Sequence, residues 1–143
     1  MNRYTVVQIF VLASASAAFA DDGRLFDAIV QVESGGRADA IGDGGKARGY
    51  VQAWRSCWTD GTQALGVKWD YATGTKDLAK CRAVFFAYGK RYGAKTPEDF
   101  ARAWNSGPNW RKKLSKTDGY WHKVKSEMER TRHGRPSTRP AAK

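Results

Sequence analysis

The sequence predicts a predominantly α, single-domain protein, and three observations support this. The chain has 143 residues, a length that suits one domain with one modest core. Apolar residues recur at helical spacing in four segments, near residues 25–33, 76–92, 96–104 and 120–130. Residues that favour helix starts or ends flank most of these segments. The sequence contains no internal repeat and no phosphate-binding glycine loop.

Residues 1–20 have the composition of a signal peptide. Arg3 gives a positive start, residues 6–12 are mostly apolar, and Ala18-Phe19-Ala20 is an A-x-A cleavage site. The apolar run is too short and interrupted for a membrane span, although an N-terminal anchor remains the alternative. We therefore predict export to the periplasm or the medium, with no stable membrane span after cleavage. The mature chain would begin at Asp21.

The first helix is predicted from Leu25 onwards, because Leu25 and Ile29 open an apolar pattern of helical period. Asp21 or Asp22 can cap its start, and Gly35 can adopt the left-handed conformation that follows a last turn.

Glu33 lies near the end of this helix, four residues after Ile29 and seven after Phe26, so it leans towards the apolar face. The last turn also favours a cation over an anion. Both placements disfavour the ionised form, so we expect a raised pKa. Such a carboxylic acid can protonate a leaving oxygen as a general acid.

Asp43 has the opposite surroundings, since it lies between Gly42 and Gly44, close to Lys46 and Arg48. A wet and partly cationic turn should keep it ionised. Two carboxyl groups in contrasting environments form the pattern of a glycosidase, with a proton donor and a nucleophile or charge stabiliser. The alternative is a solvated glutamate and an ordinary turn aspartate.

The segment 49–55 that follows is predicted as either a short hairpin or a loop that runs into a helix. Gln52 within it is a candidate hydrogen-bond partner for substrate, or simply an exposed polar residue. Trp54, Trp58 and Trp69 come next. Aromatic faces stack on sugars, but tryptophans also fill small cores, and we expect most of these three to be core residues.

A central core helix is predicted from about Lys76 to Tyr92, capped by Thr75 and ended by Gly93. Its apolar stripe comprises Leu78, Cys81, Phe85, Tyr88 and Tyr92.

The next helix begins at Thr96, an N-cap, with Pro97 in the first turn. It places Phe100, Ala103 and Trp104 inwards and ends in a polar turn over residues 105–110. Asn105 and Asn109 could bind sugar hydroxyls or N-acetyl groups, or they could only cap the helix and shape the turn.

After the basic run Arg111–Lys113, we predict a loop over residues 115–119. Asp118 would then cap a helix from Tyr120 to about Arg130, with Trp121, Val124 and Met128 on one face. Residues 131–143 are polar, basic and contain proline, and we expect a disordered tail there. The predicted domain therefore spans residues 21–130.

Cys57 and Cys81 are the two cysteines of the chain, and in an exported protein they most simply form one disulfide. Neither histidine lies in a cluster with metal-ligand spacing, so we expect no metal and no cofactor.

The net charge is +11, and +10 without Arg3 of the leader. Such a protein is attracted to polyanions. Export makes an anionic cell envelope a better partner than nucleic acid, and a solvated basic face is the alternative.

Several motifs, in order, resemble the invertebrate-type (destabilase-like) lysozymes. They are V-E-S-G-G from Val32, D-G-G-K-A-R-G-Y-V-Q from Asp43, C-W-T-D-G from Cys57, A-Y-G-K-R-Y-G from Ala87, A-W-N-S-G-P-N-W from Ala103 and T-D-G-Y-W-H-K-V from Thr117. The resemblance covers residues 25–125. It implies an α+β, predominantly α lysozyme-like domain with a short β hairpin beside the cleft.

The resemblance also implies a function, namely cleavage of the β-1,4 bond between N-acetylmuramic acid and N-acetylglucosamine in peptidoglycan. Glu33 matches the general acid of the family, and Asp43 resembles its second carboxylate, with Asp39 as the fallback. Tyr50, Gln52, Asn105 and Gly107 would contact substrate. We expect an antimicrobial or wall-degrading monomer.

Two features depart from the family pattern. Animal members are rich in disulfides, whereas this chain has only two cysteines. The family usually has G-P-x-Q-I where this chain reads G-Y-V-Q-A from Gly49.

Two other functions fit the same residues. A lytic transglycosylase would use Glu33 alone and leave a 1,6-anhydro product. A non-catalytic, basic envelope-binding protein would not need Glu33 at all.

Overall fold

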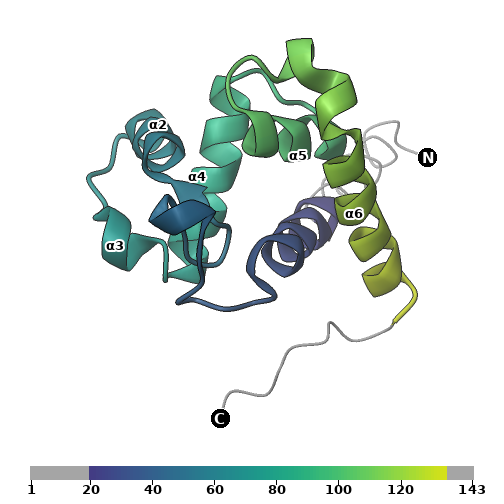
Figure 1. The fold of residues 1–143 in the computed structure, drawn as a ribbon, viewed down its shortest axis with the longest axis horizontal. Coiled ribbons are helices and arrows are strands. Elements are labelled where there is room, and N and C mark those ends of the chain that lie inside the picture. Colours follow the sequence, from purple (N-terminus) through teal and green to yellow (C-terminus); the bar gives the residue numbers. More distant parts are fainter. Residues whose placement is uncertain (1–19, 135–143) are drawn as a thin grey trace, which may run out of the picture.

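The computed structural model describes residues 20–134 (Figure 1). Residues 1–19 of the predicted leader and most of the predicted tail lie outside the described residues, so both remain predictions. Within residues 20–134, no helix is long and apolar enough to cross a membrane. The predicted fold class is confirmed, because the protein is mostly helical with one small antiparallel sheet.

The N-terminal helix is described over residues 20–34. Leu25 and Ile29 are fully buried, as the apolar pattern predicts. The predicted cap at Asp21 or Asp22 is wrong, because both residues already lie inside the helix, where Asp21 pairs with Arg24. The helix ends as predicted at Gly35, whose φ is +62°.

The sheet contains three two-residue strands in the order β1-β2-β3: β1 (Ile41–Gly42), β2 (Ala47–Arg48) and β3 (Ala53–Trp54). β2 pairs antiparallel with both neighbours, and the 3-10 helix η1 (Asp43–Gly45) joins β1 to β2. β3 then runs directly into a helix, so the segment 49–55 contains both structures that the sequence suggested. Gly49 is required in its turn, because a Cβ there would lie 1.9 Å from the carbonyl oxygen of Thr75.

The sequence did not reveal α2 (Arg55–Leu65) or the short α3 (Tyr71–Gly74). α2 buries Trp58, Gly61 and Thr62 instead of a stripe of large apolar residues. A Cβ at Gly61 would lie 2.7 Å from the side chain of Val84 in the neighbouring helix α4. Close helix packing through a glycine leaves no apolar periodicity to detect.

The central helix is α4 (Leu78–Arg91), which packs against α2 and α5. Cys81, Phe85 and Tyr88 of the predicted stripe are buried, while Leu78 and Tyr92 pack against the core from its edge. The predicted cap is wrong: the side chain of Asp77, not Thr75, accepts the N–H of Lys80 at 3.1 Å.

Helix α5 (Pro97–Ser106) begins as predicted, with Thr96 as N-cap and a reciprocal capping box to Asp99. Phe100, Ala103 and Trp104 are buried. The predicted helix start is therefore confirmed in its cap and in its inward face.

The C-terminal part differs from the prediction. After η2 (Trp110–Lys113), helix α6 runs without interruption from Leu114 to Arg132 and includes the predicted loop and the first residues of the predicted tail. Arg102 of α5 explains the difference. It donates to the Leu114 carbonyl at 2.6 Å, to the Thr117 hydroxyl at 2.8 Å and to Asp118 at 2.8 Å. Asp118 is therefore an ion-pair partner rather than a helix cap.

The predicted disulfide is absent, because Cys57 and Cys81 are free thiols. Cys81 is buried and its thiol lies 3.3 Å from the Thr75 carbonyl oxygen. Cys57, on α2, instead contacts Tyr88. Tyr88 is seven residues beyond Cys81 on α4, or about 10 Å along a helix. The two thiols thus have different neighbours, Tyr88 for Cys57 and the Thr75 carbonyl oxygen for Cys81.

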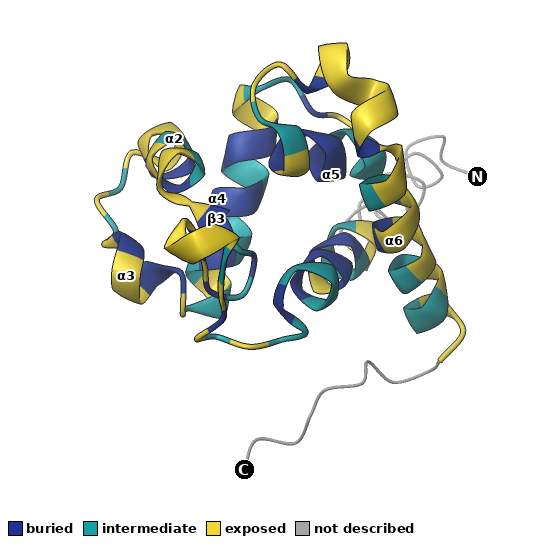
Figure 2. Ribbon diagram, viewed as in Figure 1, coloured by how far each residue is buried: buried dark blue, intermediate teal, exposed yellow. Residues whose placement is uncertain are grey.

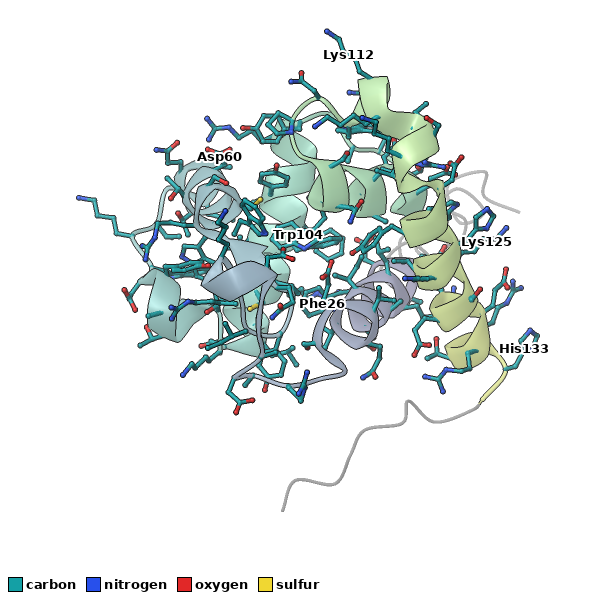
Figure 3. The ribbon with its side chains drawn as sticks, viewed as in Figure 1. Phe26, Asp60, Trp104, Lys112, Lys125 and His133 are labelled. Atoms are coloured by element: carbon teal, nitrogen blue, oxygen red, sulfur yellow. The ribbon has the colours of Figure 1, made fainter. Side chains whose placement is uncertain are left out.

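α4 and α5 occupy the middle of the molecule, with α2, α3 and the sheet on one side and the N-terminal helix and α6 on the other (Figure 1). The buried residues lie mainly on α4, α5 and the N-terminal helix (Figure 2). Figure 3 shows Phe26 and Trp104 in the interior, whereas Lys112, Lys125 and His133 project outwards. The core is therefore shared by elements from both sides.

Candidate active site

A cleft of about 640 Å³ brings together five of the six residues that the sequence predicted for the site. They are Glu33, Asp43, Gln52, Asn105 and Gly107. The cleft is also lined by Trp54, Ser56, Cys57, Tyr88, Trp104 and Lys113. Its walls therefore come from the N-terminal helix, the sheet, α2, α4 and α5.

Glu33 is partly buried at the end of the N-terminal helix. The hydroxyl of Tyr120 on α6 donates a 2.6 Å hydrogen bond to its Oε1 atom. Burial raises the pKa of Glu33 to about 7, and the nearby charge of Asp43 adds to the rise, while the hydrogen bond from Tyr120 opposes it. The carboxyl therefore keeps its proton over much of the range below neutrality, as the sequence suggested.

Tyr120 itself stays protonated, because burial and the Glu33 carboxyl raise its pKa well above the ordinary range. It is thus a hydrogen-bond donor at every pH at which the protein is normally studied.

Asp43 is exposed in η1, with φ +49°, a left-handed conformation that is uncommon outside glycine. The indole N–H of Trp54 donates to its Oδ2 atom at 3.0 Å. The fallback residue Asp39 is also exposed but does not line the cleft. The structure therefore brings Asp43, rather than Asp39, into the same cleft as Glu33.

Gln52 also has positive φ, +48°. Its side-chain nitrogen donates to the carbonyls of Ala40 at 3.0 Å and Gly49 at 3.1 Å, so both amide hydrogens are used within the loop. Its Oε1 lies against Gly42, where a Cβ would approach to 2.3 Å. Gln52 therefore holds the sheet loops in place, and it could offer a ligand only its oxygen.

The turn that ends α5 forms the opposite wall. Asn105 is exposed, and Gly107 has φ +86°, which glycine adopts without strain. Lys113 donates to the Ser106 carbonyl at 2.9 Å, which places a cation at this edge of the cleft. Asn109, also considered from the sequence, is exposed and does not line the cleft.

Tyr50 is not brought together with the other predicted residues. It packs against the core and lines a separate hollow of about 230 Å³ with Gln31 and Leu78. Its carbonyl oxygen accepts the Ser34 hydroxyl at 2.7 Å, and this bond ties the end of the Glu33 helix to the sheet. Tyr50 is thus next to the site in sequence but directed elsewhere.

Sequence reasoning missed Tyr120 and Trp54 as neighbours of the two carboxylates. Tyr120 is 87 positions from Glu33, so no local pattern connects them. Trp54 was considered together with two other tryptophans that were expected mostly in the core. Trp58 confirms that expectation with 2% exposure, whereas Trp54 is 43% exposed. The exposed fraction of the side chain distinguishes Trp54 from Trp58, and only the folded structure gives that fraction.

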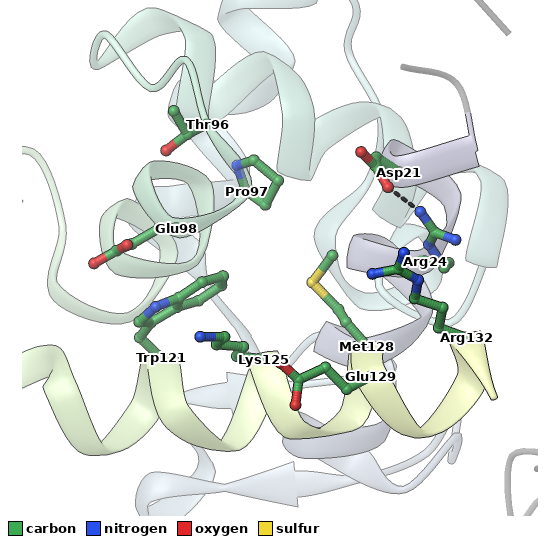
Figure 4. A pocket seen from close by; sticks show the side chains of 10 residues that line it. All are labelled: Asp21, Arg24, Thr96, Pro97, Glu98, Trp121, Lys125, Met128, Glu129 and Arg132. Carbon is green, nitrogen blue, oxygen red and sulfur yellow. Dashed lines mark hydrogen bonds and ion pairs between the residues drawn. The ribbon is translucent and has the colours of Figure 1, made fainter. Parts of the chain in front are cut away.

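Two further hollows adjoin α6. One, of about 660 Å³, continues from Glu33 past Arg37 to Glu127. The other, of about 420 Å³, lies between α6, the start of α5 and the N-terminal helix, with Trp121 and Met128 among rim charges of both signs (Figure 4). It contains none of the predicted site residues. Across residues 20–134, no group of three or more metal-ligating side chains gathers.

No protein-family model matches the chain, and no curated protein matches it. Among solved structures, it is similar to a chain in the crystal structure of Aeromonas hydrophila PliI in complex with Meretrix lusoria lysozyme. The TM-score is 0.62 and the identity is 28%, over 72% of this chain and 87% of the other. The similarity links the protein to lysozyme, through a related fold or through an interaction.

Proposed function

We propose that the protein is an exported glycoside hydrolase of the lysozyme type, which cleaves the β-1,4 bond between N-acetylmuramic acid and N-acetylglucosamine in peptidoglycan. One observation carries the proposal. Burial raises the pKa of Glu33 to about 7, and Glu33 shares its cleft with a second, exposed carboxylate, Asp43. Two carboxyl groups in contrasting environments suit hydrolysis of a glycosidic bond, with one as proton donor and the other as nucleophile or charge stabiliser.

In this mechanism Glu33 donates its proton to the glycosidic oxygen while the bond from that oxygen to the anomeric carbon breaks. Asp43 stabilises the positive charge that develops on the sugar, as nucleophile or as counter-ion. A water molecule then attacks the anomeric carbon, displaces the Asp43 carboxylate where that group has bonded to the carbon, and loses a proton to the Glu33 carboxylate. The Tyr120 hydroxyl, 2.6 Å from Glu33, supports the ionised form between the two proton transfers.

The rest of the cleft suits an amino-sugar polymer. Trp54 offers an exposed aromatic surface, and Asn105 offers an amide at the opposite wall. Lys113, at the edge, suits the carboxylate of a muramic acid or of its peptide. The net charge of +11 favours attraction to an anionic cell envelope as a whole.

The structural similarity also supports a second candidate, a non-catalytic protein that binds a lysozyme or the envelope. Binding alone gives no reason for a glutamate whose pKa is about 7 inside a cleft of about 640 Å³. A lytic transglycosylase is the third candidate, and it would need Glu33 but not Asp43. The first experiment separates all three.

The full chain would be expressed with its own N-terminal segment, purified and incubated with purified peptidoglycan. Its mass shows whether residues 1–20 have been removed. Glu33→Gln and Asp43→Asn would be tested beside it, with Glu129→Gln, an exposed glutamate outside the cleft, as the matched control. Soluble products would be identified by mass.

Reducing muropeptides from the wild type and from the control, with activity lost in both cleft variants, would support the hydrolase. Anhydro products, with only Glu33→Gln inactive, would assign the protein to the transglycosylases. Binding to peptidoglycan without any release would refute an enzymatic function.

A further inference from the structure

We propose that Trp54 is the positioning residue for Asp43 and at the same time the aromatic platform for a sugar ring of the substrate. Its indole N–H holds Oδ2 of Asp43 at 3.0 Å, and its exposed ring lines the cleft. This inference rests on the proposed function and adds a specificity element to it.

Trp54 orients the side chain of Asp43 through a hydrogen bond. Asp43 is exposed, it lies between Gly42 and Gly44, and its φ of +49° is uncommon for a residue with a side chain. Among residues 20–134, Trp54 is the side chain that donates a hydrogen bond to it. Without this bond, the carboxylate would rotate freely on a glycine-rich turn, and a catalytic group needs a fixed position.

Trp54 has a fixed position in the fold. It pairs with Ala47 at the end of β3 and is the N-cap of α2, so its backbone is held by two elements at once. The ammonium group of Lys46 lies 5.7 Å from the ring centroid. An indole held in this way can orient a partner with little loss of its own freedom.

Trp54 differs from the buried tryptophans in the group that its indole N–H binds. Trp58, Trp104 and Trp110 are at most 7% exposed, and each donates its indole N–H to a backbone carbonyl. Such bonds satisfy a group that burial removes from water. Trp54 is 43% exposed, so water could satisfy its N–H. Its bond to a carboxylate therefore indicates a role for that carboxylate rather than for the core.

The exposed ring of Trp54 lines the cleft. A large exposed hydrophobic side chain at a cleft is the exception in this protein, where the described tryptophans other than Trp54 are buried or partly buried. The flat face of an indole suits the C–H face of a pyranose, while the polar edge remains free to bind Asp43. One residue would thus couple sugar binding to the geometry of the second carboxylate.

The test separates the edge of the ring from its face. Trp54→Phe keeps an aromatic face and removes the N–H, while Trp54→Leu removes both. On purified peptidoglycan we expect Trp54→Phe to lower kcat about 10- to 100-fold, the effect of losing a hydrogen bond to a charged group, with KM changed less than about twofold. Trp54→Leu should lower kcat equally and also raise KM severalfold.

Asp43→Asn and the double variant with Trp54→Phe complete the cycle. If Trp54 acts through Asp43, the double variant loses no more activity than Asp43→Asn alone. Trp69→Phe is the matched control. Like Trp54, Trp69 has a lysine beside its ring, 5.8 Å from the ring centroid, but it does not line the cleft. Thermal unfolding would show whether each variant is folded. If Trp54→Leu does not fold, Trp54→Phe alone tests the role of the Trp54 hydrogen bond to Asp43.

If kcat were unchanged in Trp54→Phe but strongly reduced in Asp43→Asn, this inference would be overturned and the proposed function would stand. An inactive wild type, or a fully active Asp43→Asn, would overturn both.

Discussion

Replacing Glu33 by glutamine should stabilise the folded protein at alkaline pH, and this prediction does not depend on any activity. Burial raises the pKa of Glu33 from 4.5 to about 7, so folding favours the protonated form. The stabilisation that the proton provides is fully present below pH 4.5 and is lost as the pH rises through 7. Glutamine resembles the neutral acid in shape and never ionises.

The magnitude follows from the same pKa difference. A rise from 4.5 to about 7, at 1.36 kcal/mol per unit, corresponds to about 3 kcal/mol. The free energy of unfolding of Glu33→Gln should therefore exceed that of the wild type by about 3 kcal/mol at pH 8, and by almost nothing at pH 4. Glutamine can still accept the hydrogen bond from Tyr120, so that bond does not distort the comparison.

Urea unfolding, followed by far-UV circular dichroism from pH 4 to pH 9, measures the difference directly. Glu129→Gln, at an exposed position on α6, is the matched control and should differ from the wild type by less than about 0.5 kcal/mol at every pH. A constant difference between Glu33→Gln and the wild type across the pH range would refute the reasoning, because it would mean that Glu33 does not titrate abnormally.

Three further predictions concern the contacts around this site and the core. Tyr120→Phe removes the donor that lowers the pKa of Glu33, so the alkaline limb of kcat/KM should move up by about one to two pH units. Alkylation without reductant should modify Cys57 but not the fully buried Cys81 in the folded protein, and both thiols in urea, as mass spectrometry would show. Arg102→Met should lower the free energy of unfolding by about 2–3 kcal/mol, measured with urea, because it leaves polar groups of α6 without their partner.

Each of these has its own control. Tyr92→Phe removes a similar 2.6 Å bond, from a tyrosine to Asp60, outside the cleft and should leave the pH profile in place. If the protein in urea were not alkylated and its mass were 2 Da below that of the reduced chain, Cys57 and Cys81 would form a disulfide after all. Lys80→Met breaks an exposed pair with Asp77 and should change stability by less than about 1 kcal/mol. If Arg102→Met changed the free energy of unfolding no more than Lys80→Met does, the proposed structural role of Arg102 would be wrong.

The elements that the sequence predicted well are those whose signals lie within a few residues. Thr96, Pro97 and Asp99 specify the start of α5 through a capping box, and the glycine at position 35 specifies the end of the first helix. The apolar stripe of α4 is equally local. The candidate cleft residues were found partly from such patterns and partly from the resemblance to a family of lysozymes.

Predictions failed where partners distant in sequence decide the local structure. Residues 115–119 read as a loop, yet Arg102 holds them in α6 through Thr117 and Asp118. α2 escaped detection because it packs on α4 through Gly61, which carries no hydrophobic signal. Tyr50 read as a cleft residue, but the turn after Gly49 directs it away.

By itself the sequence determined the fold class, the position of Glu33 at a helix end and the glycine-rich turn of Asp43, because backbone preferences and apolar period act over short distances. Only the tertiary structure decided which groups meet in space. The Tyr120 hydroxyl reaches Glu33, the Trp54 indole reaches Asp43, and Cys57 faces Tyr88 instead of Cys81. These contacts depend on how the helices pack around α4, and packing is a property of the whole core rather than of any segment.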